Sequence, residues 1–197
     1  MSGEYGRAMA SSRPDRRGTK EWIAYGERSI YESKWMKVHL VDVEAPDGSR
    51  FEHHVVRMQR VAVAVVLNEE RDAVLMLRRH RFIDDSWGWE VPVGIVEADE
   101  EAVVTAGREV LEETGWRPHG FRRVVGFQPA IGIADTPHEV FVGHGAEHEG
   151  DPTDLTEADE IAWVPVENLL AMVNDGSIRD GATLIGVLHL VASRGTP

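Results

Sequence analysis

The sequence predicts an α+β fold in which helices and a mixed sheet form an α/β/α sandwich, with an extra antiparallel β-hairpin or sheet at the N-terminus. Three observations predict it. Short β-rich apolar runs recur along the chain, helical periodicity is limited to three segments, and strands do not alternate with helices as in a regular βαβ repeat. With 197 residues, of which 42% are hydrophobic and 28% charged, the chain can build one good core.

The N-terminal part divides into a tail and an extended segment. Residues 1–20 are small, polar and rich in Gly, Ser and Arg, which is typical of a disordered tail. Within residues 21–57, the turn-forming sequence Pro46-Asp47-Gly48 separates two β-rich stretches and predicts a hairpin. Residues 58–197 then form the main domain.

The main domain is expected to begin with a strand that is buried on both faces. Residues 61–67 are a continuous apolar run without the alternation of a half-exposed strand. Further strands are predicted at 73–77, 122–127, 139–143 and 161–164. Helices are predicted at 166–173 and 182–192, and because the second has no polar stripe, it is expected to be well buried.

The third predicted helix, residues 100–114, follows Asp99 as its N-cap and ends at Gly115 in the manner of a left-handed C-cap. Its apolar side includes Val103 and Val104, with Gly107 in the middle. A glycine costs a helix interior about 1 kcal/mol against alanine. Gly107 is therefore expected to permit close approach to a packed strand.

This helix carries an unusual concentration of acids. Residues 94–116 hold seven acidic side chains and one basic side chain, Arg108. Glu109, Glu112 and Glu113 share an arc of roughly 100° on a helical wheel, without a cationic side chain beside them. One interpretation is a solvated helix face. The other is a divalent-cation site, because Mg²⁺ and Mn²⁺ prefer carboxylate oxygens.

Composition argues against several classes of partner. The net charge of −13 provides no basic footprint for nucleic acid, so no nucleic-acid partner is expected. No apolar run is long enough to span a bilayer, so no membrane partner is expected. The chain has no cysteines, which excludes disulfides and thiolate chemistry, and its N-terminus has no hydrophobic signal segment. A cytoplasmic location is the default expectation.

The spacing of the acidic segment resembles the complete Nudix box, a 23-residue motif. Its fixed positions are filled by Gly94, Glu100, Arg108, Glu109, Val110, Glu112, Glu113, Gly115 and Trp116. The resemblance implies a Nudix sandwich that hydrolyses a nucleoside diphosphate linked to another moiety, with Mg²⁺ or Mn²⁺ as cofactor. It implies Glu109, Glu112 and Glu113 as metal ligands, joined by the Gly94 carbonyl. It also implies that Arg108 braces the box by pairing with Glu100.

Beyond the box, residues 30–190 resemble the ADP-ribose pyrophosphatase-like branch of that family. The features are the N-terminal β segment, the arginine-bearing stretch 77–82 with 87–94, and a loop containing Pro129 and Gly132. The resemblance implies ADP-ribose or a related nucleotide sugar as the small-molecule substrate, and a homodimer formed through residues 21–57. The sequence departs from the branch in having Val93 for alanine and Gln-Pro-Ala for Ser-Pro-Gly at 128–130.

Several further residues are candidates for contact with the substrate or for proton transfer. The substrate-binding candidates are Arg79, Arg81, Trp87, Glu90 and Pro129, for each of which a structural role is the alternative. Arg79 and Arg81 could clamp phosphate oxygens, and Trp87 could stack on a base or sugar. The general base that accepts a proton from water is a box glutamate, or Glu157 or Glu160 in the downstream acidic loop.

Two other functions remain open from the sequence. One is a housecleaning hydrolase of modified nucleoside triphosphates. The N-terminal β segment and the Pro129 loop argue against this function, because they resemble the ADP-ribose pyrophosphatase-like branch. The other is a non-catalytic sensor of nucleotide sugars, which would be expected to lack a box carboxylate, whereas this chain has them all.

Overall fold

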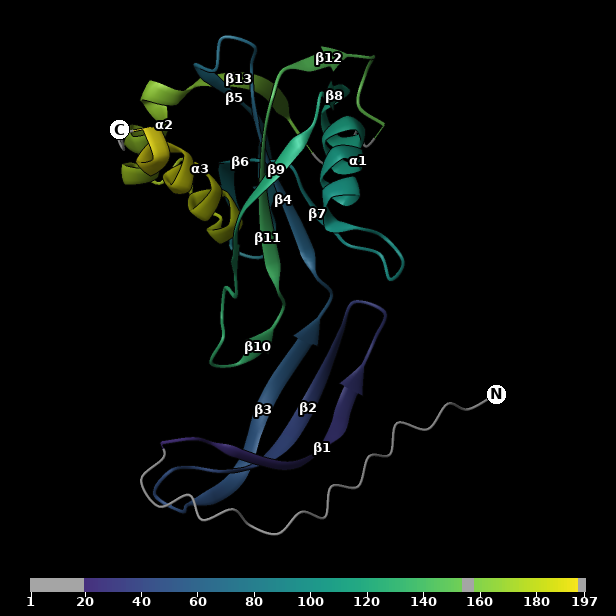
Figure 1. The fold of residues 1–197 in the computed structure, drawn as a ribbon, viewed down its shortest axis with the longest axis vertical. Helices are drawn as coiled ribbons and strands as arrows, with labels where there is room; N and C mark the ends of the chain where they lie inside the picture. The colour runs from purple at the N-terminus through teal and green to yellow at the C-terminus, as the bar shows by residue number, and fades with distance from the viewer. Residues whose placement is uncertain (1–19, 154–157, 195–197) are drawn as a thin grey trace.

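A computed structural model describes residues 20–153 and 158–194. The tail prediction for residues 1–20 therefore lies, apart from Lys20, outside the described residues, as does Glu157. Figure 1 shows a two-part arrangement, in which a long N-terminal sheet lies below the main domain. The elements are β1 (Ile23–Glu32), β2 (Met36–Glu44), β3 (Arg50–Met58), β4 (Val61–Leu67), β5 (Ala73–Arg81), β6 (Ser86–Glu90), β7 (Val93–Ile95), α1 (Ala102–Thr114), β8 (Trp116–Pro118), β9 (Phe121–Phe127), β10 (Ala134–Asp135), β11 (His138–His144), β12 (Ala146–His148), β13 (Glu160–Pro165), α2 (Val166–Asn174) and α3 (Gly181–Arg194).

The main domain is built on a mixed sheet whose order is β13-β5-β4-β11-β9, with β6 paired to β5 and β7 paired to β4. The two central strands, β4 and β11, are parallel, and the other pairings are antiparallel. Helix α1 lies on one face of this sheet, and helices α2 and α3 lie on the other (Figure 1). The predicted α/β/α sandwich is confirmed.

The central strand β4 separates two hydrophobic clusters, as its uninterrupted apolar sequence predicts. Val63 and Val65 face the cluster that α2 and α3 cover, whereas Ala62 and Ala64 face the cluster under α1. All four are buried. Because neighbouring strand residues point to opposite faces, a strand between two helical layers needs apolar side chains at every position.

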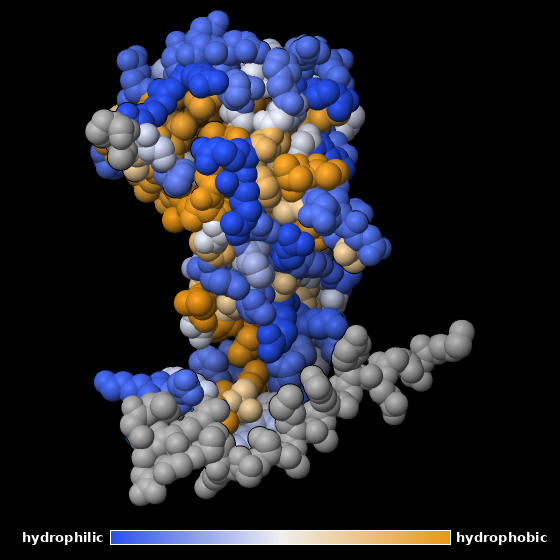
Figure 2. All heavy atoms as spheres, viewed as in Figure 1, coloured by the Kyte–Doolittle hydropathy of each residue, from blue (hydrophilic) through white to orange (hydrophobic). Residues whose placement is uncertain are grey.

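The N-terminal segment is a larger unit than the predicted hairpin. Strands β1, β2 and β3 form an antiparallel meander, and β10 adds in parallel to β3, although it lies far along the chain. The side chains of β1 after Ile23 are exposed, and its hydrophobic and polar residues do not alternate as they would in a half-buried strand. Figure 2 shows hydrophobic side chains at the surface of both the main domain and the N-terminal sheet.

Several local predictions for helix α1 are wrong. The helix begins at Ala102 after Glu101, whose side chain makes no capping hydrogen bond, so Asp99 is not the N-cap. Val103 and Val104 are exposed, and a β-carbon on Gly107 would meet nothing within 4 Å. The helix is rotated so that its small residues and Val110 face the sheet. The predicted left-handed C-cap at Gly115 is confirmed, with φ of 74°.

The last helix, α3, is only half buried. Val187 and Leu190 pack against the sheet, whereas Ile185 and Leu188 are exposed, although the sequence shows no polar stripe. Apolar composition therefore did not distinguish a fully buried helix from one with a free apolar face. Within the described ranges, no helix is both long and apolar enough to cross a membrane.

Candidate active site

The loop between β7 and α1 brings the first glycine of the box against its helix. Gly94 pairs with Ala62 on β4, and a β-carbon at position 94 would overlap the side chain of Glu109. Glycine at 94 is therefore required by close approach and not by an unusual backbone angle. The contact places the Glu109 carboxylate beside the backbone of β7.

Arg108 is the centre of the charged network on this helix. Its Nε and Nη2 donate to the Glu100 carboxylate over 3.2 and 3.1 Å. Its Nη1 donates to Glu109 Oε1 over 2.8 Å and to Glu112 Oε2 over 2.9 Å. The predicted brace between Arg108 and Glu100 is confirmed, and the same guanidinium also draws two of the predicted metal ligands together.

The pKa values in this network follow from burial and pairing. Hydrogen bonds from Arg108 and then from Thr105 lower the pKa of Glu100 below its ordinary value. Burial raises the pKa of Glu109, and this desolvation outweighs the attraction of Arg108. The hydrogen bond with Glu100 raises the pKa of Arg108, which stays cationic. The site thus holds an acid whose charge is poorly solvated in the protein alone.

Glu113 lies apart from this network, on the buried side of α1. Its Oε1 accepts a hydrogen bond from Arg79 Nη2 over 3.0 Å, and both side chains are almost fully buried. Arg79 also lies 3.8 Å from the Glu90 carboxylate, which accepts a hydrogen bond from Arg81 Nε over 2.9 Å. The arginines of β5 therefore connect the sheet to the box helix.

The interpretation that the three box glutamates lack a cationic neighbour is wrong. Arg108 contacts Glu109 and Glu112, and Arg79 contacts Glu113. The helical wheel missed both contacts, because Arg79 arrives from a distant strand and the Arg108 side chain folds along the helix. Within residues 20–153 and 158–194, no three acidic or histidine side chains gather as a ready metal cluster.

The chemistry of the donors nevertheless fits a divalent cation at Glu109 and Glu112. Both present carboxylate oxygens that converge on one positively charged nitrogen, and the raised pKa of Glu109 marks a carboxylate that a bound cation would stabilise. Glu113 does not share this point of convergence.

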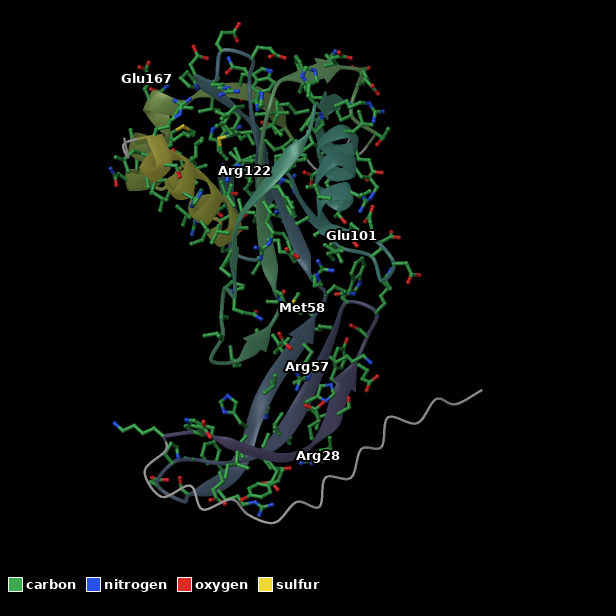
Figure 3. All side chains as sticks on the ribbon, in the orientation of Figure 1. Arg28, Arg57, Met58, Glu101, Arg122 and Glu167 are labelled. Carbon is green, nitrogen blue, oxygen red and sulfur yellow. The ribbon has the colours of Figure 1, made fainter. Side chains whose placement is uncertain are left out.

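A cleft of about 750 Å³ opens beside this network. It lies between the box and the N-terminal sheet, and it is lined by Trp35, Met58, Gln59, Arg60, Ile95, Val96, Glu97, Ala98, Arg108 and Glu109. Figure 3 shows Met58 at the junction of the two parts of the molecule and Glu101 at the start of α1. The volume of the cleft is within the range of sites that bind small molecules.

Sequence reasoning missed the residues that the N-terminal sheet contributes to this cleft. Trp35 lies in the turn between β1 and β2 with 58% of its surface exposed, and Arg60 lies between β3 and β4. The available signal for Trp35 was the neighbouring Lys34, whose ammonium lies 4.4 Å from the centroid of the indole ring. Nothing in the local sequence indicated that this turn would lie beside the box loop.

None of the predicted substrate-binding residues lines this cleft. Trp87 is half exposed on β6, where the Arg78 guanidinium lies 4.7 Å from its ring centroid. Pro129 lies in an exposed loop that packs toward the N-terminal sheet, where His53 contacts the Gly132 carbonyl over 2.9 Å. Glu160, a candidate for the base, is exposed on β13 opposite Arg78.

Comparisons with known proteins agree with this architecture. A sequence model of the NUDIX domain matches residues 58–181. The chain is 40% identical over 174 residues to the CMP-5'-(N-acetyl-N-hydroxy-3-aminopropyl)phosphonate hydrolase of Streptomyces rubellomurinus, with 88% of this chain and 84% of that protein covered. It is 26% identical over 166 residues to the ADP-ribose pyrophosphatase of Bacillus subtilis, covering 83% and 89%.

A solved structure shows the same fold. The crystal structure of an ADP compounds hydrolase matches with a TM-score of 0.75 over 89% of this chain and 96% of that chain. Because the sequence identity is 15%, the likeness concerns the fold alone.

Proposed function

We propose that this chain, which belongs to the Nudix family, hydrolyses the diphosphate of a nucleoside diphosphate linked to a sugar, most simply ADP-ribose or a related nucleotide sugar. The family match and the relatives support a Nudix pyrophosphohydrolase that acts on nucleoside diphosphate derivatives. The substrate, the residues that bind it and the dependence on a metal ion are proposed here.

One observation carries the proposal. Arg108 holds Glu109 and Glu112 together at the edge of a cleft that is large enough for a small-molecule ligand. A diphosphate is a poor electrophile because its anionic oxygens repel a nucleophile. Charge neutralisation therefore has to occur at the same place as substrate binding, and Glu109, which Arg108 holds beside Glu112, lines the cleft.

Nudix hydrolases generally use divalent metal ions, and we assign Mg²⁺ or Mn²⁺ to Glu109 and Glu112, with the Gly94 carbonyl and Glu113 as further ligands. When bound, such an ion neutralises phosphate oxygens and acidifies a water molecule. The protein's own residues prepare the site. Gly94 leaves room for the Glu109 carboxylate, and Arg108 holds the carboxylates of Glu109 and Glu112, which would hold the ion, close together.

Two other features support binding of a nucleotide in the cleft. The exposed indole of Trp35, which lines the same cleft as Arg108 and Glu109, offers a flat surface on which a base can stack. Arg60 also lines the cleft and carries positive charge, although it pairs with Glu139 over 2.6 Å. Within this proposal, Glu112, Glu113, Glu157 and Glu160 remain the candidates for the base. Arg79 and Arg81, which do not line the cleft, pair instead with Glu113 and Glu90.

A second substrate is favoured by one comparison. The relative that is 40% identical is a hydrolase of a CMP-linked phosphonate, in which the nucleotide is joined to a phosphonate and not to a sugar phosphate. The reaction class is the same, because water would divide a nucleotide from a second phosphorus group. An assay therefore has to distinguish whether the group joined to the nucleotide is a sugar phosphate or a phosphonate.

A product assay with the full chain and Mg²⁺ tests both substrates. The panel contains ADP-ribose, GDP-mannose, a CMP-linked alkylphosphonate and nucleoside triphosphates. AMP and ribose 5-phosphate from ADP-ribose support the first proposal, and CMP with free phosphonate supports the second. Pyrophosphate released from a triphosphate without turnover of ADP-ribose, GDP-mannose or the CMP-linked phosphonate, or tight binding of ADP-ribose without turnover of any compound, would overturn both.

A further inference from the structure

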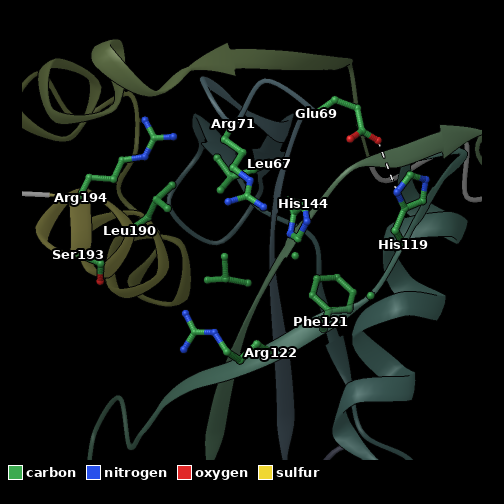
Figure 4. A pocket seen from close by; sticks show the side chains of 13 residues that line it. Leu67, Glu69, Arg71, His119, Phe121, Arg122, His144, Leu190, Ser193 and Arg194 are labelled. Carbon is green, nitrogen blue, oxygen red and sulfur yellow. Dashed lines mark ion pairs between the residues drawn. The ribbon is translucent and has the colours of Figure 1, made fainter.

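We infer that the protein has a second binding site, for a phosphorylated small molecule, on the side of the sheet opposite the box helix. The site is a cavity of about 950 Å³, larger than the cleft beside the box. It lies among the end of β4, the start of β9, the end of β11 and the last turn of α3, and none of its lining residues belongs to the box (Figure 4).

The charge of this cavity is the first argument. Arg71, Arg122 and Arg194 all line it, and they come from a turn, a strand and a helix (Figure 4). Every other arginine in the described ranges forms an ion pair with a carboxylate. These three form none with any described residue, in a chain whose net charge is −13. Three uncompensated guanidinium groups around one cavity indicate an anionic ligand.

The one carboxylate among the described residues that line the cavity is paired with another residue. Glu69 also lines the cavity, but its Oε1 lies 3.4 Å from Nδ1 of His119, and Figure 4 shows this pair directed away from Arg122. Gly145 makes this arrangement possible, because a β-carbon there would overlap both Glu69 and His119. The acid is thus held at the rim by a partner of its own.

The backbone around Arg71 is the second argument. Arg71 has φ of 61°, one of two positive values among the non-glycine residues described. The turn is held in place because the Asn68 side chain accepts hydrogen bonds from the amides of Asp72 and Ala73 over 2.9 and 3.0 Å. Strained residues that are held by their surroundings cluster at ligand sites. The strain here directs an arginine to the cavity.

The shape of the cavity fits a ligand larger than a bare ion. Leu67 and Leu190 supply buried apolar walls, and the Phe121 ring is partly exposed beside them. Gly143 allows β11 to lie against the backbone of Gly120, where a β-carbon would overlap the Gly120 carbonyl. Arginines at the rim with apolar and aromatic walls below are the combination that a nucleotide or sugar phosphate requires.

Calorimetric titration of the full chain in EDTA at low ionic strength tests this inference, with inorganic phosphate, pyrophosphate and AMP as probes. We expect at least one probe to bind, and Arg122→Gln or Arg71→Gln to weaken it about tenfold, the usual effect of losing one charged hydrogen bond. Arg28→Gln, which makes the same charge change on the N-terminal sheet, should leave binding unchanged. Stronger binding of AMP than of phosphate would identify a nucleotide, and equal binding would identify the phosphoryl group alone.

The location of binding is tested independently by NMR. The ring signals of His119 and His144, which line the cavity, should shift during the titration in the wild type and in Glu112→Gln, and not in Arg122→Gln. Arg122→Lys, which keeps the charge but loses the planar fork, should bind with intermediate strength. The inference is wrong if no probe binds at millimolar concentration, or if Arg122→Gln and Arg71→Gln bind as tightly as the wild type.

Discussion

At the scale of single residues, Arg108 determines the state of the box. It pairs with three carboxylates, Glu100, Glu109 and Glu112, and so offsets the repulsion among the acids of this helix. Glu100 is held on one side of the guanidinium, and the two proposed ligands are held at Nη1. One arginine thus acts both as a structural brace and as a substitute countercharge.

Glu112→Gln should reduce kcat/KM for the best substrate by about 10²-fold or more, because it removes a negatively charged oxygen where a cation has to be held. Glu112 is partly exposed, so the fold should survive the change. Glu101→Gln is the matched control, since Glu101 is exposed on the same helix and its side chain makes no capping bond. Steady-state rates with Mg²⁺ check this, and equal rates for the two variants would contradict the metal assignment.

Glu139 should make a measurable contribution to the pH dependence of stability. A hydrogen bond from Arg60, then one from Arg123, lowers its pKa in the folded protein, whereas the pKa in the unfolded chain is about 4.3. Its contribution to the free energy of unfolding is therefore fully present above about pH 5 and is lost as the pH falls through the folded-state pKa.

Urea unfolding of the wild type and Glu139→Gln at pH 7 and at pH 3.5 checks this contribution. The wild type should be the more stable protein at pH 7, and the difference should shrink at pH about 3.5. A difference that is constant with pH would show that the ion pairs of Glu139 do not determine it.

At the scale of elements, helix α1 contains one glycine that is required and one that is not. Gly107→Ala should stabilise the protein by about 1 kcal/mol, because the glycine lies in a helix interior and its β-carbon would enter open space. This would raise Tm by roughly 2–4 °C for a chain of this size. Thermal unfolding followed by circular dichroism measures the change.

Gly115→Ala is the opposing control in the same helix. Its φ of 74° and the overlap of a β-carbon with the Gly150 carbonyl should lower stability by more than about 1 kcal/mol. If Gly107→Ala also destabilised the protein, the position would have a packing partner that the described contacts do not include.

At the scale of the whole molecule, the N-terminal sheet carries several large hydrophobic side chains that are exposed to solvent. Trp22, Tyr25, Ile30, Tyr31 and Phe51 are all more than 40% exposed, and they lie on or beside β1 and β3. Exposed patches of this kind mark contact surfaces. The predicted homodimer through residues 21–57 would cover them.

Light scattering after size exclusion should therefore give about twice the chain mass of 22.0 kDa. Tyr31→Asp should shift the protein toward the monomer, because it would bury a charge in the interface. Val104→Asp, an equivalent change at an exposed site on α1, should leave the mass unchanged. A monomeric wild type would refute the dimer.

The sandwich, the box and the pairing of Arg108 with Glu100 could be predicted from the amino-acid sequence alone. These depend on short-range rules, namely the two-sided burial of residues 61–67, the left-handed cap at Gly115 and the fixed spacing from Gly94 to Trp116. Each is a property of neighbouring residues, so it can be recognised without knowing what lies across space.

The sequence did not predict which charged side chains meet or which surfaces form cavities, because both depend on the packing of distant elements. Arg79 reaches Glu113 from a strand 34 positions earlier, and Trp35 joins the cleft beside Glu109 from another sheet. Arg71, Arg122 and Arg194 surround one cavity although no sequence pattern connects them. Such contacts depend on how distant elements pack and on which face of each element is turned inward. The rotation of α1, which exposed Val103 and Val104, shows that a helical period alone leaves that choice open.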